Sequence, residues 1–494
     1  MEFESGLFDV AIIGCGVSGA NIARRLSAYS IKTAILEKSA DVSFGTSKAN
    51  SGIIHGGFHH NKKYLKARLE MQGSLMFDQL RRELNFPFRR CGIIVAALHH
   101  DEMKVVEHLY LQGVENEVIG IELCSRLRML ELEPKLSSDV VGGLYAPGGG
   151  IIEPYRFVFA LVESALKNGV KLFTNFKVIK ANRDTSGGED FWTIKSEDNT
   201  NSCCKEIKAR YVINAAGLFA DEVSKIFGAE DFTITSRKGE YFLLDRLTKA
   251  CPSKVVFPVP TAVSKGMLVI PTVEGTVLVG PTADAADDKN DFSTTQKHLE
   301  QILICGKTMI PSLSQNDVIT SFSGLRPCLE SDFYIEASKK APAFVQVAGI
   351  QSPGLTASPA IAEYVKNILV EMGLQLTEKP GWNPIVENHP SVRDFICGEN
   401  PNIEELDSLI NKDSAWGNMV CRCENVSEAE IVQAIKLGHT TLDGIKYFTR
   451  AQMGRCQGGF CTYKIIKIIM RETGLSIEEV TKHGAQSFVL AGVL

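Results

Sequence analysis

The chain lacks the features that would place it in a membrane or on nucleic acid. None of its apolar runs reaches the length of about 20 residues that a membrane-spanning helix needs. Its 53 basic and 58 acidic residues are interspersed, so no block of one charge suggests nucleic acid or an anionic membrane surface. Its acidic start, MEFESGLFDVAIIG, differs from a secretory signal, which would begin basic. We therefore expect a cytoplasmic protein without a membrane span or nucleic-acid partner, attached to the inner membrane at most peripherally through another protein.

What is present is ordinary globular composition in a long chain. With 494 residues, 44% hydrophobic and 22% charged, the chain is too long for one core and predicts two or three domains. Most of its 13 cysteines are scattered among apolar residues, as expected of small buried side chains in a reducing compartment. Only the last four cysteines form a pattern.

The N-terminal segment predicts a strand, a glycine turn, a helix and a second strand. Residues 8–13 form a largely apolar run, residues 20–28 have helical periodicity, and residues 32–36 are expected to form the next strand, which ends at Glu37. A strand that leads through a glycine turn into a helix and a second strand is the beginning of a Rossmann-like nucleotide-binding domain.

The turn itself carries the dinucleotide fingerprint G-x-G-x-x-G at Gly14, Gly16 and Gly19. These glycines permit the tight turn, the approach of backbone to a pyrophosphate, and close packing of helix on strand. The following helix presents N–H groups and positive potential to the phosphates. Glu37, 18 residues after Gly19, is placed to accept hydrogen bonds from ribose hydroxyls.

The loop after the second strand, FGTSKANSGIIHGGF, favours FAD over NAD. NAD-binding folds more often continue directly into another helix, whereas this loop offers hydroxyl, amide and backbone donors. We expect it to line the flavin and the second phosphate through Thr46, Ser47, Asn50, Ser51 and Gly52.

The middle of the chain mixes nucleotide-domain segments with short alternating runs. A helix is expected over 154–167, a strand over 171–179, and a further helix in which Pro359 lies near the start. Runs such as EYFLLD, KVVFPV and TVLVGPT, separated by Gly and Pro, predict an antiparallel sheet. We predict an α/β (α+β) fold: a discontinuous FAD-binding domain (1–85, 145–225, 320–375), an inserted substrate domain (86–144, 226–319), a linker (376–415) and a small helical C-terminal domain (416–494).

The C-terminal cysteines follow the pattern C-x-C, 32 residues, C-x4-C, at Cys421, Cys423, Cys456 and Cys461. Four thiolates can hold a zinc ion or an iron–sulfur cluster. The tight C-x-C spacing favours the cluster, although zinc and an unliganded set of thiols stay open. Two capping boxes, Ser427-x-x-Glu430 and Ser476-x-x-Glu479, predict short helices in the same domain.

The stretches CRCENVSEAEIVQAI and TTLDGIKYFTRAQMGRCQGGFC resemble the bacterioferritin-associated-ferredoxin-like [2Fe–2S] domain. In that family the four cysteines are the cluster ligands. The rest of the chain resembles the FAD-dependent oxidoreductases that include D-amino-acid oxidase, through the glycine fingerprint, NSGIIHGGF, VINAAG and GIQSPGLTASPAIA. The resemblance implies flavin contacts from a further set of residues: Val178, Ala216, Gly217, Gly349, Gly354, Leu355 and Thr356.

Within that superfamily two relatives compete. The combination of flavin domain and cluster domain is similar to the catalytic subunit of anaerobic glycerol-3-phosphate dehydrogenase. The stretch NSGIIHGGFHHNKKYLKA looks more like L-2-hydroxyglutarate oxidases. Because the domain architecture fits, the implied substrate is glycerol 3-phosphate first, L-2-hydroxyglutarate or another 2-hydroxy acid second, and an amino acid third. The implied reaction is hydride transfer to the flavin, with the electrons passed on through the cluster to a partner or to quinone. The architecture also implies a flavoprotein or iron–sulfur subunit that accepts the electrons, unless the C-terminal domain serves only for docking.

Three residues are candidates for the chemistry. His55 lies in the flavin-lining loop and titrates near neutrality, so it can serve as the base, or else simply bind flavin or backbone. Arg326, in SFSGLRPC, offers a guanidinium fork for a carboxylate or phosphate, unless it forms a structural ion pair. Tyr241, in RKGEYF, can add a hydroxyl contact or be a core side chain.

Overall fold

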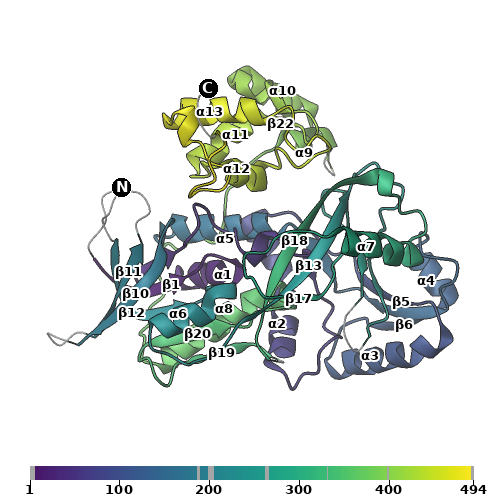
Figure 1. Ribbon diagram of the computed structural model, residues 1–494, viewed down its shortest axis with the longest axis horizontal. Helices are drawn as coiled ribbons and strands as arrows, with labels where there is room; N and C mark the ends of the chain where they lie inside the picture. The colour runs from purple at the N-terminus through teal and green to yellow at the C-terminus, as the bar shows by residue number, and fades with distance from the viewer. Residues whose placement is uncertain are drawn as a thin grey trace.

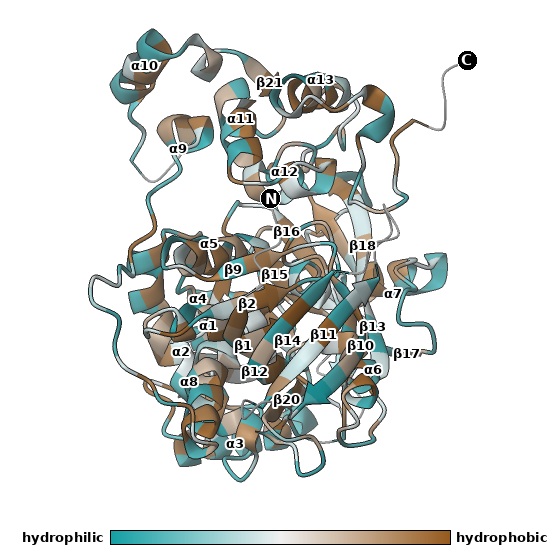
Figure 2. Cartoon of the chain, turned by 90° about the vertical axis from the view of Figure 1, so that its left-hand side faces the viewer, coloured by the Kyte–Doolittle hydropathy of each residue, from teal (hydrophilic) through white to brown (hydrophobic). Residues whose placement is uncertain are grey.

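The computed structural model describes residues 6–185, 190–197, 205–261, 266–330, 332–397 and 400–490. Two sheets with flanking helices form the main body, and the C-terminal segment forms a helical unit at one end of it (Figure 1). Strands near the middle of the body, such as β1, β2 and β15, are apolar (Figure 2). In the described part of the chain, no helix is both long and apolar enough to cross a membrane.

The first sheet is the nucleotide-binding sheet. Its parallel strands are β1 (Leu7–Ile13), β2 (Thr33–Leu36), β9 (Lys171–Phe173), β12 (Glu206–Asn214) and β20 (Phe344–Ala348). β1 lies between β12 and β2, and Ile13 at its carboxyl end pairs with Asn214 and Leu36. Antiparallel strands complete the sheet: β10 (Lys177–Asp184), β11 (Phe191–Glu197) and β19 (Tyr334–Ala337). The predicted Rossmann-like arrangement is confirmed.

Helices cover this sheet: α1 (Val17–Leu26), α2 (Leu65–Leu84), α5 (Pro154–Lys167), α6 (Ala220–Ile226) and α8 (Gly354–Glu371). The helix predicted over 20–28 begins earlier, because Gly19 lies inside its first turn rather than before it. The strand predicted over 171–179 is two strands, because Asn175 between them adopts a left-handed backbone with φ of 51°.

The prediction that Pro359 lies near the start of its helix is wrong by more than one turn. α8 begins at Gly354, so Pro359 lies in the helix interior, where its missing N–H leaves the carbonyl of Leu355 without a helical partner. The hydroxyl of Ser358 donates to that carbonyl at 2.8 Å. This local replacement explains how the helix continues through the proline.

The second sheet is largely antiparallel and is built from two separate parts of the chain. Residues 320–328, which the prediction gave to the FAD-binding domain, belong to this sheet, because their strand pairs with the strand over residues 235–244. Its strands are β5 (Ile93–Ala97), β6 (Glu122–Ser125), β7 (Gly142–Ala146), β13 (Thr235–Leu244), β14 (Val255–Pro258), β15 (Leu268–Pro271), β16 (Val277–Gly280), β17 (Asp284–Ala286) and β18 (Val318–Cys328). The helices beside it are α3 (Met103–Glu115), α4 (Arg126–Leu132) and α7 (Gln296–Met309). A third, small sheet contains β3 (Ile53–Ile54), β4 (Phe88–Arg89) and β8 (Gly150–Ile152), and both β3 and β4 pair with β8.

The C-terminal unit contains a hairpin and short helices: β21 (Met419–Cys421), β22 (Val426–Ser427), α11 (Glu428–Lys436), α12 (Leu442–Thr449) and α13 (Thr462–Thr473). The capping box at Ser427 starts α11 as predicted. The box at Ser476 starts only a single 3-10 turn, Ile477–Glu479, rather than the predicted helix.

The segment predicted as a linker also contains two helices, α9 (Val392–Cys397) and α10 (Ile403–Lys412). The side chain of Asn402 caps α10 by accepting from the N–H of Glu405 at 3.1 Å. Leu406 of α10 packs with Val392 and Phe395 of α9 in a small apolar cluster. This local burial stabilises two helices in a stretch whose Pro- and Asn-rich sequence predicted only a linker.

Candidate functional site

One cavity of about 1550 Å³ runs from the glycine turn of the nucleotide-binding sheet to the second sheet and the C-terminal unit. It is lined by loops at the carboxyl ends of β1 and β2 and by residues of β13 and β18. Ligands of open α/β sheets bind at this edge. The volume exceeds the 300–1,000 Å³ or so of a pocket for one small ligand, so it suits a dinucleotide together with a substrate.

The glycine turn has the geometry that the fingerprint requires. Gly14 has a φ of +96°, and a Cβ on Gly19 would lie 2.1 Å from the Gly14 carbonyl oxygen. The N–H of Val17, at the start of α1, donates to the Ser47 hydroxyl at 2.8 Å. Glu37 accepts the N–H of Cys15 at 2.7 Å, so its carboxylate is fixed beside the turn and lines the cavity. These features fit the pyrophosphate and ribose of FAD.

The loop after β2 is held in place by its own side chains. The Asn50 side chain donates to the Ser47 carbonyl at 2.8 Å and accepts the N–H of Gly52 at 2.8 Å. The Thr46 hydroxyl donates to the Leu325 carbonyl of β18 at 2.7 Å, which joins the loop to the second sheet. The loop is therefore shaped before any ligand binds.

Most residues predicted to contact FAD line the cavity: Gly14, Gly16, Glu37, Thr46, Ser47, Asn50, Ser51, Gly52, Val178, Ala216, Gly217, Gly354 and Leu355. Gly19, Gly349 and Thr356 are not among the lining residues. Gly19 permits the contact of α1 with the turn, and Gly349 has a φ of +65° directly after β20. Thr356 is fully buried and accepts the N–H of His55 through its side-chain oxygen.

His55 lines the cavity and is 9% exposed. Its Nε2 lies 3.1 Å from the hydroxyl oxygen of Ser352, in the loop before α8. The ring of Phe257, from β14, lies 6.3 Å from the His55 ring between centroids. His55 is thus a largely buried imidazole with one nitrogen beside a hydroxyl group in the cavity.

Arg326 and Tyr241 line the same cavity from β18 and β13. The Tyr241 hydroxyl lies 3.0 Å from that of Ser51, and its ring stacks on Phe322 at 4.9 Å. Arg326 lies directly opposite Arg237 in the antiparallel register, and Arg237 also lines the cavity. Among the described residues no carboxylate forms an ion pair with either arginine. Two like charges side by side favour an anion between them.

Sequence reasoning missed Arg237, Ser352 and Phe257. Ser352 belongs to the GIQSPGLT stretch, where a hydroxyl before a helix start is a usable signal. Arg237 shows itself only through the register of β13 against β18, which depends on tertiary pairing. Phe257 looks like any core residue of an alternating strand.

The four cysteines come together as two pairs. The sulfur atoms of Cys423 and Cys456 lie 3.5 Å apart, and the thiols of Cys421 and Cys461 hydrogen-bond to each other. The backbone N–H of Gln452 points at Cys421 and Cys461. α13 begins directly after Cys461, which directs the positive end of its dipole to the thiols.

Within the described ranges no group of three or more His, Cys, Asp or Glu side chains is arranged to hold a single metal ion. Two close thiol pairs suit a centre with two irons, where each iron takes two thiolates. The donor set is all sulfur and its flanking N–H groups favour negative charge. It therefore fits a [2Fe–2S] cluster.

The C-terminal unit closes one end of the cavity. The ring of Tyr447, in α12, lies 5.1 Å from that of Tyr155, in α5, and 6.1 Å from that of Phe44. The Tyr155 hydroxyl contacts the sulfur of Met453 at 3.7 Å, and Met453 precedes Cys456 by three residues. The cysteine loop, the stretch around Cys456 that contains Met453 and Gln457, thus borders the same cavity as the glycine turn.

Comparisons with known proteins agree with this geometry. Residues 9–368 match the family described as FAD dependent oxidoreductase, and residues 419–471 match the BFD-like [2Fe-2S] binding domain. A glycerol 3-phosphate dehydrogenase of Caloramator mitchellensis is 40% identical over 489 residues, which cover 98% of both chains.

Two further relatives are shorter. A glycerol 3-phosphate oxidase of Mycoplasma genitalium is 34% identical over 382 residues, 76% of this chain and 97% of that protein. The dithionite-reduced L-α-glycerophosphate oxidase of Mycoplasma pneumoniae, solved with FAD bound, superposes with a TM-score of 0.73 at 32% identity and covers 78% of this chain and 100% of that chain. The protein therefore belongs to the FAD-dependent oxidoreductase family and carries a BFD-like [2Fe–2S] binding domain after its flavin-binding region.

Proposed function

We propose that the protein is a dehydrogenase that oxidises glycerol 3-phosphate and passes the electrons singly through its [2Fe–2S] domain to a partner. The observation that carries the proposal is the single cavity bordered by the FAD loops, by His55 and Arg326, and by the cysteine loop. The relative that matches over the whole chain is named a glycerol 3-phosphate dehydrogenase.

The residues of the second sheet suit the phosphate. Arg326 and Arg237 present two guanidinium groups to the cavity from adjacent strands, and a phosphate dianion can accept from both. Tyr241 can donate its hydroxyl to the substrate from the same sheet. These contacts would hold the substrate with its hydroxyl-bearing carbon toward the flavin.

His55 suits the role of the base. It lines the cavity, packs beside Phe257, and has its Nε2 next to the Ser352 hydroxyl. There it can take the proton of the substrate hydroxyl as the carbon–hydrogen bond breaks. Bound FAD supplies the two-electron acceptor for the hydride. The N–H groups at the start of α8 lie at the cavity through Gly354 and Leu355 and would stabilise negative charge that develops there.

The four cysteines Cys421, Cys423, Cys456 and Cys461 would hold the cluster. The length of the relatives supports a role of this domain in electron transfer. The oxidases align with this chain over 97% or more of their own length, but they cover only about three quarters of this chain. The dehydrogenase covers 98% of this chain. We infer that the domain directs electrons away from oxygen and toward a flavoprotein or iron–sulfur acceptor subunit.

The test is an anaerobic spectrum of the purified holoprotein. Glycerol 3-phosphate should bleach the flavin absorbance and then the cluster absorbance, while L-2-hydroxyglutarate at the same concentration should leave both unchanged. Bleaching by L-2-hydroxyglutarate but not by glycerol 3-phosphate would identify L-2-hydroxyglutarate as the substrate. Absence of bleaching with either compound would refute the proposed reaction.

A further inference from the structure

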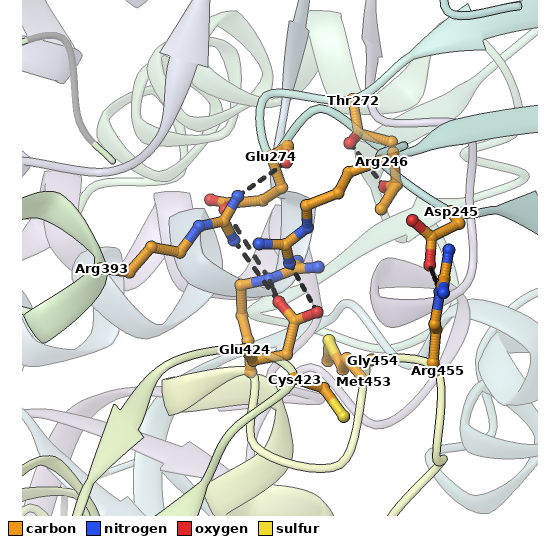
Figure 3. Close-up of polar contacts among 12 residues, drawn as sticks. Asp245, Arg246, Thr272, Glu274, Arg393, Cys423, Glu424, Met453, Gly454 and Arg455 are labelled. Atoms are coloured by element: carbon orange, nitrogen blue, oxygen red, sulfur yellow. Dashed lines mark hydrogen bonds and ion pairs between the residues drawn. The ribbon is translucent and has the colours of Figure 1, made fainter. Parts of the chain in front are cut away.

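Glu424, directly after Cys423, is the acidic centre of a buried ion cluster. It is 3% exposed, and its carboxylate meets three guanidinium groups (Figure 3). The N–O distances are 2.6 Å to Arg246, 3.1 Å to Arg450 and 3.4 Å to Arg393. A carboxylate held by three arginines is constrained in both position and orientation.

The three arginines come from three different parts of the chain. Arg246 follows β13 of the second sheet, Arg393 lies in α9, and Arg450 ends α12. Two further carboxylates complete the cluster: Glu274, from the β15–β16 turn, meets Arg393 and Arg450, and Glu153, at the start of α5, meets Arg450. The three negative and three positive groups balance, and they join the C-terminal unit to the second sheet and to the start of α5.

Because these ion pairs are buried, they fix the position of the C-terminal unit on the main body. Burial opposes the charge of Arg450, but Glu153, Tyr155, Glu274 and Glu424 together raise its pKa well above the ordinary value. The guanidinium therefore stays charged. Removing one member of such a cluster leaves its partners buried and unbalanced, which is far more costly than breaking a surface pair.

The loop that carries Cys456 is held at the same turn after β13 as the loop that carries Cys423 and Glu424. A Cβ on Gly454 would lie 2.3 Å from the Cβ of Cys423 and 3.0 Å from a carboxylate oxygen of Glu424, so the two cysteine loops touch directly. Arg455, beside Cys456, pairs with Asp245 at 2.5 Å, and Asp245 adjoins Arg246. Each cysteine loop is thus tied by an ion pair to the turn that follows β13 (Figure 3).

We propose that Glu424 is a positioning residue that holds the cluster against the flavin cavity and thereby sets the rate of electron passage from flavin to cluster. This role rests on the proposed function. Oxidation of the alcohol to the ketone releases two electrons and two protons. With FAD and the cluster bound, the electrons would pass one at a time from the flavin through the cluster to the acceptor, and both protons would be released to solvent. Electron tunnelling weakens steeply with distance, so a loosened unit transfers more slowly.

The test compares Glu424→Gln with Glu428→Gln in the anaerobic holoprotein. Glu428 pairs with Arg471 at 2.5 Å wholly within the C-terminal unit, so it is the matched control. After mixing with glycerol 3-phosphate, stopped-flow spectra resolve flavin bleaching from cluster reduction. We expect flavin bleaching within about twofold of wild type in both variants, and cluster reduction slower by about tenfold or more in Glu424→Gln alone. Iron and sulfide content should be unchanged.

Hydrogen–deuterium exchange provides the second measurement. Glu424→Gln should increase exchange in residues 153–160 and 442–450, which form the contact of α5 with α12, and Glu428→Gln should not. Arg246→Gln should repeat both effects from the other side of the contact, which covers the case that Glu424→Gln fails to fold. Unchanged exchange, or cluster reduction at the wild-type rate, would overturn the positioning role alone. A wild-type cluster that stays oxidised while the flavin bleaches would overturn the proposed function and this role with it.

Discussion

The side-chain oxygen of Thr356 accepts the backbone N–H of His55 at 2.9 Å. The same hydroxyl lies 3.4 Å from the carbonyl oxygen of Ile53, to which it donates, and Thr356 is fully buried. Thr356 stands in the first turn of α8, and His55 follows β3. The two bonds therefore fix the proposed base relative to the helix that faces the flavin, although Thr356 is not among the residues that line the cavity.

Thr356→Val should slow flavin reduction without loss of FAD. The valine keeps the volume but leaves the N–H of His55 buried without its acceptor, which costs about 1–3 kcal/mol and displaces the imidazole. We expect anaerobic flavin reduction to fall by roughly tenfold. Thr356→Ser retains the hydroxyl and is the control. Equal rates in the two variants would show that the bond does not position His55.

His55→Gln tests the base directly. Glutamine can still meet the Ser352 hydroxyl but cannot take a proton at neutral pH, so flavin reduction should fall by about 10²–10⁴-fold. Ser352→Ala leaves the imidazole in place and should have a much smaller effect. A variant that reduces the flavin at the wild-type rate would exclude His55 as the base.

Arg326→Lys tests the phosphate contact. A lysine keeps the charge but loses the planar fork, so the KM for glycerol 3-phosphate should rise by about tenfold or more while flavin reduction at saturation changes less. Arg237→Lys, on the opposite strand, should raise KM by a smaller factor because Arg237 is the more exposed of the two. An unchanged KM in both variants would remove the arginine pair from the substrate site.

Features set by local chemistry could be predicted from the sequence. The glycine turn is one, because Gly14 and Gly19 stand where a positive φ or a contact of 2.1 Å excludes any other residue. The capping box of Ser427 is another, because both hydrogen bonds join residues three apart. In each case the interacting groups are close in the chain, so their spacing alone carries the information.

Features set by distant pairing could not be predicted. Arg237 meets Arg326 only through the register of β13 and β18, and Glu424 meets Arg246 only once the C-terminal unit lies on the second sheet. The interior position of Pro359 was also hidden, because the compensating bond from Ser358 depends on a rotamer rather than on spacing. From the sequence alone, Glu424 beside Cys423 cannot be told from an ordinary surface carboxylate, because its arginine partners are distant in the chain.

Cys456→Ser tests the electron path. Serine is a poor ligand for iron, and the remaining thiols cannot complete the set, so the cluster should be lost or altered. We expect flavin reduction by glycerol 3-phosphate to stay close to wild type, while electron delivery to the acceptor falls to background. Cys305→Ser, a partly buried cysteine in α7, is the control. Full delivery in Cys456→Ser would make the C-terminal unit a docking element without an electron role.

The last prediction concerns Glu430, whose carboxylate accepts from the N–H and the hydroxyl of Ser427, both at 2.8 Å. Burial raises its pKa to about 7 from an ordinary value of 4.5. Between these pH values the folded state holds a proton that the unfolded state has released. The free energy of unfolding should therefore fall as pH rises from 4.5 to 7, by about 3 kcal/mol in total, and then stay level.

Glu430→Gln keeps the cap acceptor but cannot ionise, so its melting temperature should not show this fall. Calorimetry between pH 5.5 and 8 should show that the melting temperature of the variant exceeds that of wild type by an amount that grows up to about pH 7. Glu479→Gln is the matched control, because Glu479 occupies the same capping position at Ser476 but is exposed, and Ser476 lowers its pKa. The stabilisation from that group is lost only in more acidic solution, as pH falls through its folded-state pKa, so wild type and Glu479→Gln should give parallel curves in this window. Parallel curves for Glu430→Gln as well would mean that Glu430 is already ionised in the folded protein, and that water reaches the cap.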